Sequence, residues 1–182
     1  MATLSLRQAS RQLVNQVGLG EDAFTHLYQG QLRPIFNYVR YRLGPAEAEE
    51  VTADIFARVW ARRQDYDPAR GTAETWLWAI ARNATRDWLR RRRPALTDFP
   101  SNLAAAQDPA ADVVRQEDWQ QMQAALRKLR SLDQEIIALR FGAGETNRAI
   151  ATMLGLSEAN VAQRLRRALQ RLRACLQGGD RP

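Results

Sequence analysis

Apolar side chains recur every three or four residues along most of this chain, and that spacing predicts a protein built from amphipathic helices. No stretch alternates polar residues with Val, Ile or Thr as a half-buried strand does, and no Asn-Gly or Asp-Gly pair marks a hairpin. We therefore expect an all-α fold. Pro34 either kinks the first long helix or divides it. The expected helices begin with a short one after Ser5 and then cover about residues 21–43, 46–63, 73–93, 113–130, 133–141, 147–154 and 158–176.

The helical spacing lapses between residues 94 and 112, where three prolines stand among alanines and aspartates. We interpret this segment as a flexible, acidic linker between two small helical domains. The alternative is a long loop inside one domain, although nineteen residues is long for a connection in a compact fold. The expected divisions are an N-terminal extension at 1–21, a first domain at 22–93, a linker at 94–117 and a second domain at 118–176.

Charge points to a nucleic-acid partner. The chain has a formal net charge of +7, and 26 of its 27 basic residues are arginine. Residues 24–93 carry +5, residues 94–117 carry −3 and residues 118–182 carry +5, so two basic blocks flank an acidic one. Arginine binds phosphate through a planar fork of donors, which favours nucleic acid. The alternative explanation is that the high share of arginine merely reflects the base composition of the genome.

Several classes of protein are disfavoured by what the sequence lacks. The single cysteine, Cys175, excludes a disulfide framework within the chain, and its apolar helix face favours an inert thiol over a redox sensor. The first residues lack the apolar core of a secretory signal, and no apolar run is long enough to cross a bilayer. The only histidine, His26, is expected to be packed, and no phosphate-binding loop, nucleophile motif or metal-spaced cluster is found. We expect a cytoplasmic protein that is not an enzyme, with no cofactor, no metal and no membrane insertion.

The segment "NRAIATMLGLSEANVAQRLRRAL" has the spacing of a helix-turn-helix, a motif that places its second helix in the DNA major groove. Ala151 suits a close crossing of two helices, Gly155 suits a turn that needs positive φ, and Ser157 suits a helix cap. Unrelated helical hairpins share parts of this pattern. We expect Arg173 to be merely solvated. On the last helix the expected core stripe is Val161, Leu165, Ala168, Leu169, Leu172 and Leu176, and the expected DNA-facing stripe is Asn160, Gln163, Arg164, Arg167 and Arg171.

The stretch "ARNATRDWLRRRRP" at 81–94 predicts a second basic surface. Asn83, Arg86 and Arg90 are spaced by three and four residues, on a different face from the apolar stripe. Asp87 is placed to pair with Arg90 or Arg91, so the arginines extend an ordered helix. A helix with aromatic residues at its start and arginines at its end is suited to hold unstacked bases and duplex phosphates.

Together these segments resemble a bacterial RNA polymerase sigma factor of the extracytoplasmic function (ECF) group, in the sigma-70 family. The resemblance covers about residues 22–176 and rests on two sets of motifs, one on each side of the linker. The first set is "FTHLY", "EAEEVTADIFARVW" and "TWLWAIARNATRDWLRRRR", and the second is "LRKLRSLDQEIIALRF" with the helix-turn-helix segment. The resemblance implies a two-domain, all-helical protein that binds core RNA polymerase, directs it to promoter DNA and helps to open the DNA strands there.

The resemblance also implies roles for parts of the chain. Residues 22–93 correspond to the family's region 2, which binds polymerase and the −10 element, and residues 118–176 correspond to region 4, which binds the −35 element. An anti-sigma protein is a further implied partner. The implied DNA-binding residues are Trp76, Asn83, Arg86 and Arg90 in the first domain and Asn160, Gln163, Arg164 and Arg167 in the second.

On the helix that contains Val51 to Trp60, the implied partner is the clamp of the large polymerase subunit. The residues expected to contact it are Glu49, Asp54 and Arg58, while Phe56 and Trp60 are expected to pack in the core. Of the neighbouring tryptophans Trp76 and Trp78, at least one is expected to be simply buried.

This chain departs from the family's frequent pattern in places that matter for specificity. Ala73 and Glu74 stand where an aromatic residue and an arginine are frequent, and "NVAQR" at 160–164 replaces a frequent "TVKSR". The promoter sequence read by better-known members therefore cannot be transferred. The alternative function is a free-standing helix-turn-helix regulator, which would form a symmetric dimer on palindromic half-sites.

Overall fold

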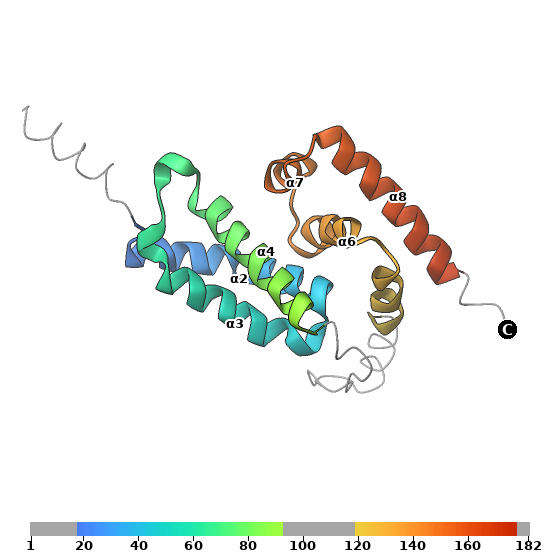
Figure 1. Cartoon of the computed structure of the whole chain (residues 1–182), viewed down its shortest axis with the longest axis horizontal. Helices are drawn as coiled ribbons and strands as arrows, with labels where there is room; N and C mark the ends of the chain where they lie inside the picture. The colour runs from blue at the N-terminus through green and yellow to red at the C-terminus, as the bar shows by residue number, and fades with distance from the viewer. Residues whose placement is uncertain (1–17, 93–118, 178–182) are drawn as a thin grey trace, which may run out of the picture.

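The computed structural model describes residues 18–92 and 119–177, and helices account for most of these residues (Figure 1). No strand occurs in either described range, in agreement with the all-α prediction. The helix expected after Ser5 and the linker at 94–117 lie outside the described residues. The elements are α2 (Glu21–Leu43), α3 (Pro45–Ala61), η1 (Arg63–Asp65), η2 (Pro68–Arg70), α4 (Ala73–Arg92), an unlabelled helix at 119–127, α6 (Ser131–Ile137), η3 (Ala138–Gly142), α7 (Asn147–Leu154) and α8 (Glu158–Gln177).

The first unit consists of α2, α3 and α4, whose apolar faces meet in one core. Pro34 lies inside α2, which continues through it as a single helix. Pro45 occupies the first turn of α3, where its missing N–H has no helical partner to lose. The fully buried apolar side chains of this unit are Ile35, Val39, Ala48, Ile55, Val59, Leu77 and Ala81.

The second unit contains the helix-turn-helix that the sequence predicts. The Oγ1 atom of Thr146 accepts a hydrogen bond from the Ala149 N–H at 3.1 Å and caps α7. Gly155 ends α7 in the left-handed conformation, with φ 65° and ψ 37°, which only glycine adopts at little cost. The Oγ atom of Ser157 then accepts from the Asn160 N–H at 3.2 Å and caps α8. The turn and the cap expected from Gly155 and Ser157 are therefore confirmed.

Several expectations about burial are wrong. Trp60, Leu169 and Leu176, which the helical spacing assigns to core faces, are 38%, 41% and 44% exposed. His26, expected to be packed, is exposed on α2. The Trp60 ring lies at the end of α3 between the Phe24 ring, 4.9 Å between centroids, and the Arg63 guanidinium, 4.1 Å from its centroid, and these neighbours leave it partly exposed. On α8 the neighbouring helices cover only a narrow stripe, so apolar spacing alone overestimates the buried face.

The two units lie against each other, and their buried side chains form one continuous cluster (Figure 1). Tyr38 and Trp78 of the first unit, with ring centroids 5.3 Å apart and edge to face, share this cluster with Leu139 of the second. Gly142 approaches α2 so closely that a Cβ there would lie 3.0 Å from the main-chain oxygen of Asn37. The sequence predicts the two units, but it does not predict this seam between them.

The short helix that precedes α6 contacts both units. Its first residue, Trp119, packs edge to face on Tyr41 with centroids 5.2 Å apart, and the Arg40 guanidinium stands 4.3 Å from the Trp119 ring centroid. Further along the same helix, Leu126 is buried in a second apolar cluster with Ala168 of α8. One short element therefore joins the end of α2 to α8 of the second unit.

Candidate nucleic-acid interface

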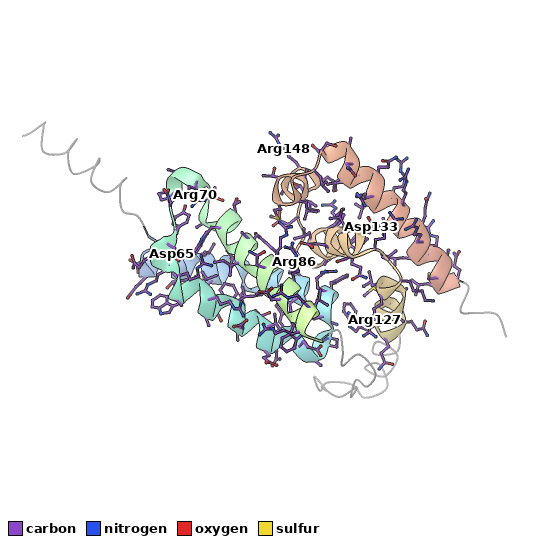
Figure 2. The ribbon with its side chains drawn as sticks, viewed as in Figure 1. Asp65, Arg70, Arg86, Arg127, Asp133 and Arg148 are labelled. Atoms are coloured by element: carbon purple, nitrogen blue, oxygen red, sulfur yellow. The ribbon has the colours of Figure 1, made fainter. Side chains whose placement is uncertain are left out.

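One candidate DNA-binding surface is the outer face of α4. Asn83, Arg86 and Arg90 are exposed, and Arg86 is seen on this helix in Figure 2. The Arg90 guanidinium pairs with the Asp87 carboxylate at 3.1 Å, as the sequence predicts, but the Arg90 side chain is still 78% exposed. The opposite face of α4 is fully buried through Trp78 and its apolar neighbours. The helix is thus held firmly while its polar face remains free to meet a ligand.

Trp76 lies at the start of α4, beside the loop formed by η1 and η2. Its ring is half-buried and meets the Tyr66 ring at 5.7 Å between centroids. The Tyr66 hydroxyl donates to the Gly71 carbonyl at 3.0 Å, and Asp67 caps η2, so the loop has a defined shape. Of the two neighbouring tryptophans, Trp78 is the buried one, which leaves Trp76 available at the loop.

A second candidate surface is the N-terminal half of α8. Gln163 and Arg167 are exposed, whereas Asn160 and Arg164 are half-buried. Arg164 donates from Nε to the Asn160 Oδ1 at 3.0 Å and from Nη1 to the Asp133 Oδ1 at 3.0 Å. Asp133 lies on α6 (Figure 2). Its side chain is only 10% exposed. Arg164 therefore ties α8 to α6 and orients Asn160, a role that the sequence pattern alone did not reveal.

The residues expected to contact polymerase lie on α3. Glu49 is exposed, and Asp54 pairs with Arg58 at 2.8 Å, one turn apart, with side chains 46% and 37% exposed. All three are accessible. Elsewhere on the first unit, Tyr28 and Trp60 are exposed aromatic residues that the sequence analysis did not assign to a surface.

Polar contacts across the seam between the units were not foreseen from the sequence. The Arg82 Nε on α4 pairs with the Glu135 Oε1 on α6 at 2.6 Å, and its Nη1 donates to the Met153 carbonyl near the end of α7. The Arg42 Nη1 donates to the Gln134 Oε1 at 2.9 Å. Spacing in the sequence cannot reveal such contacts because they join residues more than fifty positions apart.

Three further properties limit what the described residues can do. Within residues 18–92 and 119–177, no group of three or more His, Cys, Asp and Glu residues could hold a metal ion. Among the same residues, none of the helices has the length and apolar character that crossing a membrane requires. Burial raises the pKa of the Tyr38 phenol well above its usual range, and the Glu135 carboxylate adds to the effect, so Tyr38 stays neutral in the core.

Comparison with known proteins identifies the class. Residues 27–95 match the family "Sigma-70 region 2", and residues 119–172 match "Sigma-70, region 4". The ECF RNA polymerase sigma factor RpoE of Cereibacter sphaeroides is 30% identical over 155 residues, covering 84% of this chain and 86% of the relative. The ECF sigma factor SigK of Mycolicibacterium vanbaalenii is 28% identical over 161 residues, covering 85% and 82%.

Solved structures agree in fold. CnrH, solved in complex with the cytosolic domain of CnrY, superposes with a TM-score of 0.66 at 27% identity, over 94% of this chain and 98% of that one. The sigma factor RpoE of Bartonella quintana, solved with the anti-sigma factor NepR, gives a TM-score of 0.63 at 21% identity, over 87% and 98%.

The fold and the two matched regions define a sigma factor of the sigma-70 type. More narrowly, the chain belongs to the ECF group of RNA polymerase sigma factors. Its function is therefore to direct transcription initiation. A free-standing helix-turn-helix regulator is not favoured, since the match extends over both sigma regions and not over the helix-turn-helix alone.

Proposed function

We propose that α4 and α8 are the two DNA-reading helices, with residues 22–93 acting at the −10 element and residues 118–176 at the −35 element. One observation carries the proposal. Arg86 on α4, and Gln163 and Arg167 on α8, are exposed on helices whose opposite faces are anchored by buried side chains. A DNA-binding helix needs this combination, because a fixed helix loses little conformational freedom when its polar face meets DNA.

The side chains are suited to different contacts with DNA. Asn83 and the half-buried Trp76 are suited to hold an unstacked base, while Arg86 and Arg90 supply phosphate contacts. On α8, Gln163 and Asn160 are suited to read base edges, and Arg164 and Arg167 complete that surface. Two weak sites on one chain act together because the binding of one raises the effective concentration of the other.

Transcription from a mapped promoter tests these assignments. We expect Arg86→Ala and Arg167→Ala each to lower run-off transcription with core polymerase about tenfold, because a lost contact of this kind costs about 1–3 kcal/mol. The matched control is Arg173→Ala, also an exposed arginine on α8 but one we expect to be solvated only. If Arg86→Ala and Arg167→Ala transcribe as well as Arg173→Ala, the assigned surfaces are not the DNA-reading ones.

We also propose that the exposed face of α3 binds the clamp of the large polymerase subunit, through Glu49, Asp54 and Arg58. All three side chains are accessible, and Asp54 and Arg58 hold each other in place. Reversing the charge with Asp54→Lys should weaken binding to core polymerase in a gel-filtration or pull-down assay. Asp22→Lys, an exposed acid on α2, is the control. Equal binding by both variants would remove α3 from the interface.

The remaining proposals concern context. We propose that the protein works in the cytoplasm as a polymerase subunit and not as an enzyme, without a cofactor, and that an anti-sigma protein restrains it. The last point is supported by the solved complex of the Bartonella quintana sigma factor with its anti-sigma factor. Gel filtration with and without core polymerase tests the subunit role: a monomer that joins the polymerase agrees with it, and a stable dimer that footprints palindromic DNA alone contradicts it.

A further inference from the structure

Arg82 is less exposed than Arg86, Arg90 and Arg91 of the same helix, and its charge is neutralised by the other unit. Its side chain is 17% exposed, and the partner carboxylate of Glu135 is 10% exposed, with 2.6 Å between the paired atoms. A second guanidinium nitrogen donates to the Met153 carbonyl on α7. Both bonds join α4 to the second unit, so the pair exists only while the two units are in contact.

Arg82 lies on the same side of α4 as two exposed arginines. Arg82, Arg86 and Arg90 are spaced by four residues, so they form one ridge along the helix. Arg86 is exposed, and the Arg90 side chain is 78% exposed, whereas that of Arg82 is only 17% exposed. The first member of a three-arginine ridge is therefore withheld from solvent by Glu135.

We propose that Arg82 is a shared residue, which pairs with Glu135 while the units are closed and joins Arg86 in binding DNA phosphate when they separate. The inference rests on the proposed role of α4 in DNA binding, and it adds that closure of the two units opposes this binding. Closure of the units and binding of DNA along α4 compete for one guanidinium. The closed arrangement thereby lowers the affinity of the free protein for DNA.

Other contacts across the seam favour closure, and one pair of acids opposes it. The bond from Arg42 to Gln134, at 2.9 Å, and the close approach of Gly142 to α2 favour closure. The pKa of the Glu145 carboxyl, just before α7, is raised by burial and then by repulsion from Glu74 in the first turn of α4. Closure therefore carries an electrostatic cost that separation of the units relieves.

The salt dependence of DNA binding counts phosphate contacts. It can therefore distinguish a contact made by Arg82 from contacts made by other surfaces that become accessible when the units separate. The experiment uses the full chain without polymerase and a fluorescent duplex of unrelated sequence, with affinity measured at several salt concentrations. One additional phosphate contact makes the slope of log affinity against log salt steeper by about 0.9, which is about 3.5-fold between about 50 and 200 mM salt. We expect this increment, and tighter binding at low salt, for Glu135→Ala and to a smaller extent for Glu135→Gln.

The double variant Arg82→Ala/Glu135→Ala provides the matched comparison. It should open as Glu135→Ala does, with a larger radius of gyration in small-angle X-ray scattering, yet keep the salt slope of the unaltered protein. Circular dichroism establishes that each variant is folded, and Glu135→Gln keeps the side-chain volume if Glu135→Ala does not fold. If the single and double variants show the same slope, or if neither Glu135 variant opens, the proposal is overturned.

The outcome is distinguishable from failure of the proposed function. Arg86 lies on the same ridge, and among the described residues it makes no hydrogen bond or ion pair with the second unit. Arg86→Ala should therefore reduce DNA binding in both the unaltered and the Glu135→Ala background. If Arg86→Ala has no effect in either, α4 is not a DNA-binding helix. If Arg86→Ala weakens binding and Glu135→Ala brings no gain, only the shared role of Arg82 fails.

Discussion

Replacement of Gly142 by alanine tests whether η3 packs tightly against α2 at the seam between the two units. A Cβ at this position would lie 3.0 Å from the main-chain oxygen of Asn37 and 3.2 Å from the Cα of Tyr38. Both are backbone atoms of α2, so no side-chain rotation can relieve the overlap. Overpacking of this kind costs about 1–3 kcal/mol. Within its own helix, however, alanine is favoured over glycine by up to about 1 kcal/mol.

The two effects have opposite signs, and they act on different equilibria. Gly142→Ala should leave each unit folded while shifting the closed arrangement toward the open one, by about 5-fold to more than 100-fold at the stated cost. Gly30→Ala is the control, because Gly30 lies in α2 and a Cβ there meets nothing within 4 Å. It should gain stability without opening. The assays are small-angle scattering for the separation of the units and urea unfolding for their stability.

If Gly142→Ala has the radius of gyration of the unaltered protein and gains stability as Gly30→Ala does, then η3 does not press on α2 in solution. The seam would then be loose, and the contacts made across it by Arg82 and Arg42 would lose their structural support.

Asp133→Ala should destabilise the second unit, because it strands the Arg164 guanidinium beside α6. Breaking a buried pair costs about 3–5 kcal/mol, but Arg164 is 31% exposed and water will screen it, so we expect about 1–2 kcal/mol in urea unfolding. The pKa of the Glu145 carboxyl is raised by burial and then by Glu74, while Arg140 bonds only its main-chain oxygen. An acid with a raised pKa favours the closed state when protonated, so this contribution is complete below the usual glutamate pKa and is lost as pH rises through the raised value. The radius of gyration should therefore increase from acidic to neutral pH, and Glu145→Gln should flatten that increase.

Exposed acids on α2 and α3 provide controls for these two variants. Asp22→Ala should leave unfolding unchanged within about 0.5 kcal/mol, as most surface substitutions do. Glu50→Gln should leave the pH dependence of the radius of gyration as it is. An Asp133→Ala variant as stable as Asp22→Ala would mean that Arg164 is free to turn toward DNA. A Glu145→Gln variant that keeps the pH dependence would assign it to another group.

Local signals in the sequence were sufficient for the elements themselves. The effects of Gly155 and Ser157 on the turn and the helix cap depend only on the backbone within a few residues. The position of the helix-turn-helix could therefore be predicted accurately from the sequence. The spacing of Asn83, Arg86 and Arg90 likewise identified an exposed face without any knowledge of the tertiary structure. These predictions succeed because helix caps, turns and helix faces are decided locally.

Tertiary contacts explain what the sequence missed. Arg164 belongs to the polar stripe of α8 by spacing, but α6 brings Asp133 beside it and gives it an internal partner. Trp60 and Leu169 belong to apolar stripes, but the neighbouring elements in residues 18–92 and 119–177 cover them only in part. Arg82 is one of many arginines in the sequence, and only the approach of α6 to α4 sets it apart. Such pairings depend on which helix faces meet, and periodicity does not encode that.

Trp119 lies where the chain can be altered without touching either proposed DNA-facing stripe. Its ring touches Tyr41 and Arg40 at the end of α2, while its helix also reaches α8 through Leu126. None of these residues belongs to either DNA-facing stripe. If closure of the units opposes DNA binding as proposed, substitutions at Trp119 are expected to change the strength of the response while leaving the sequence that is read as it is.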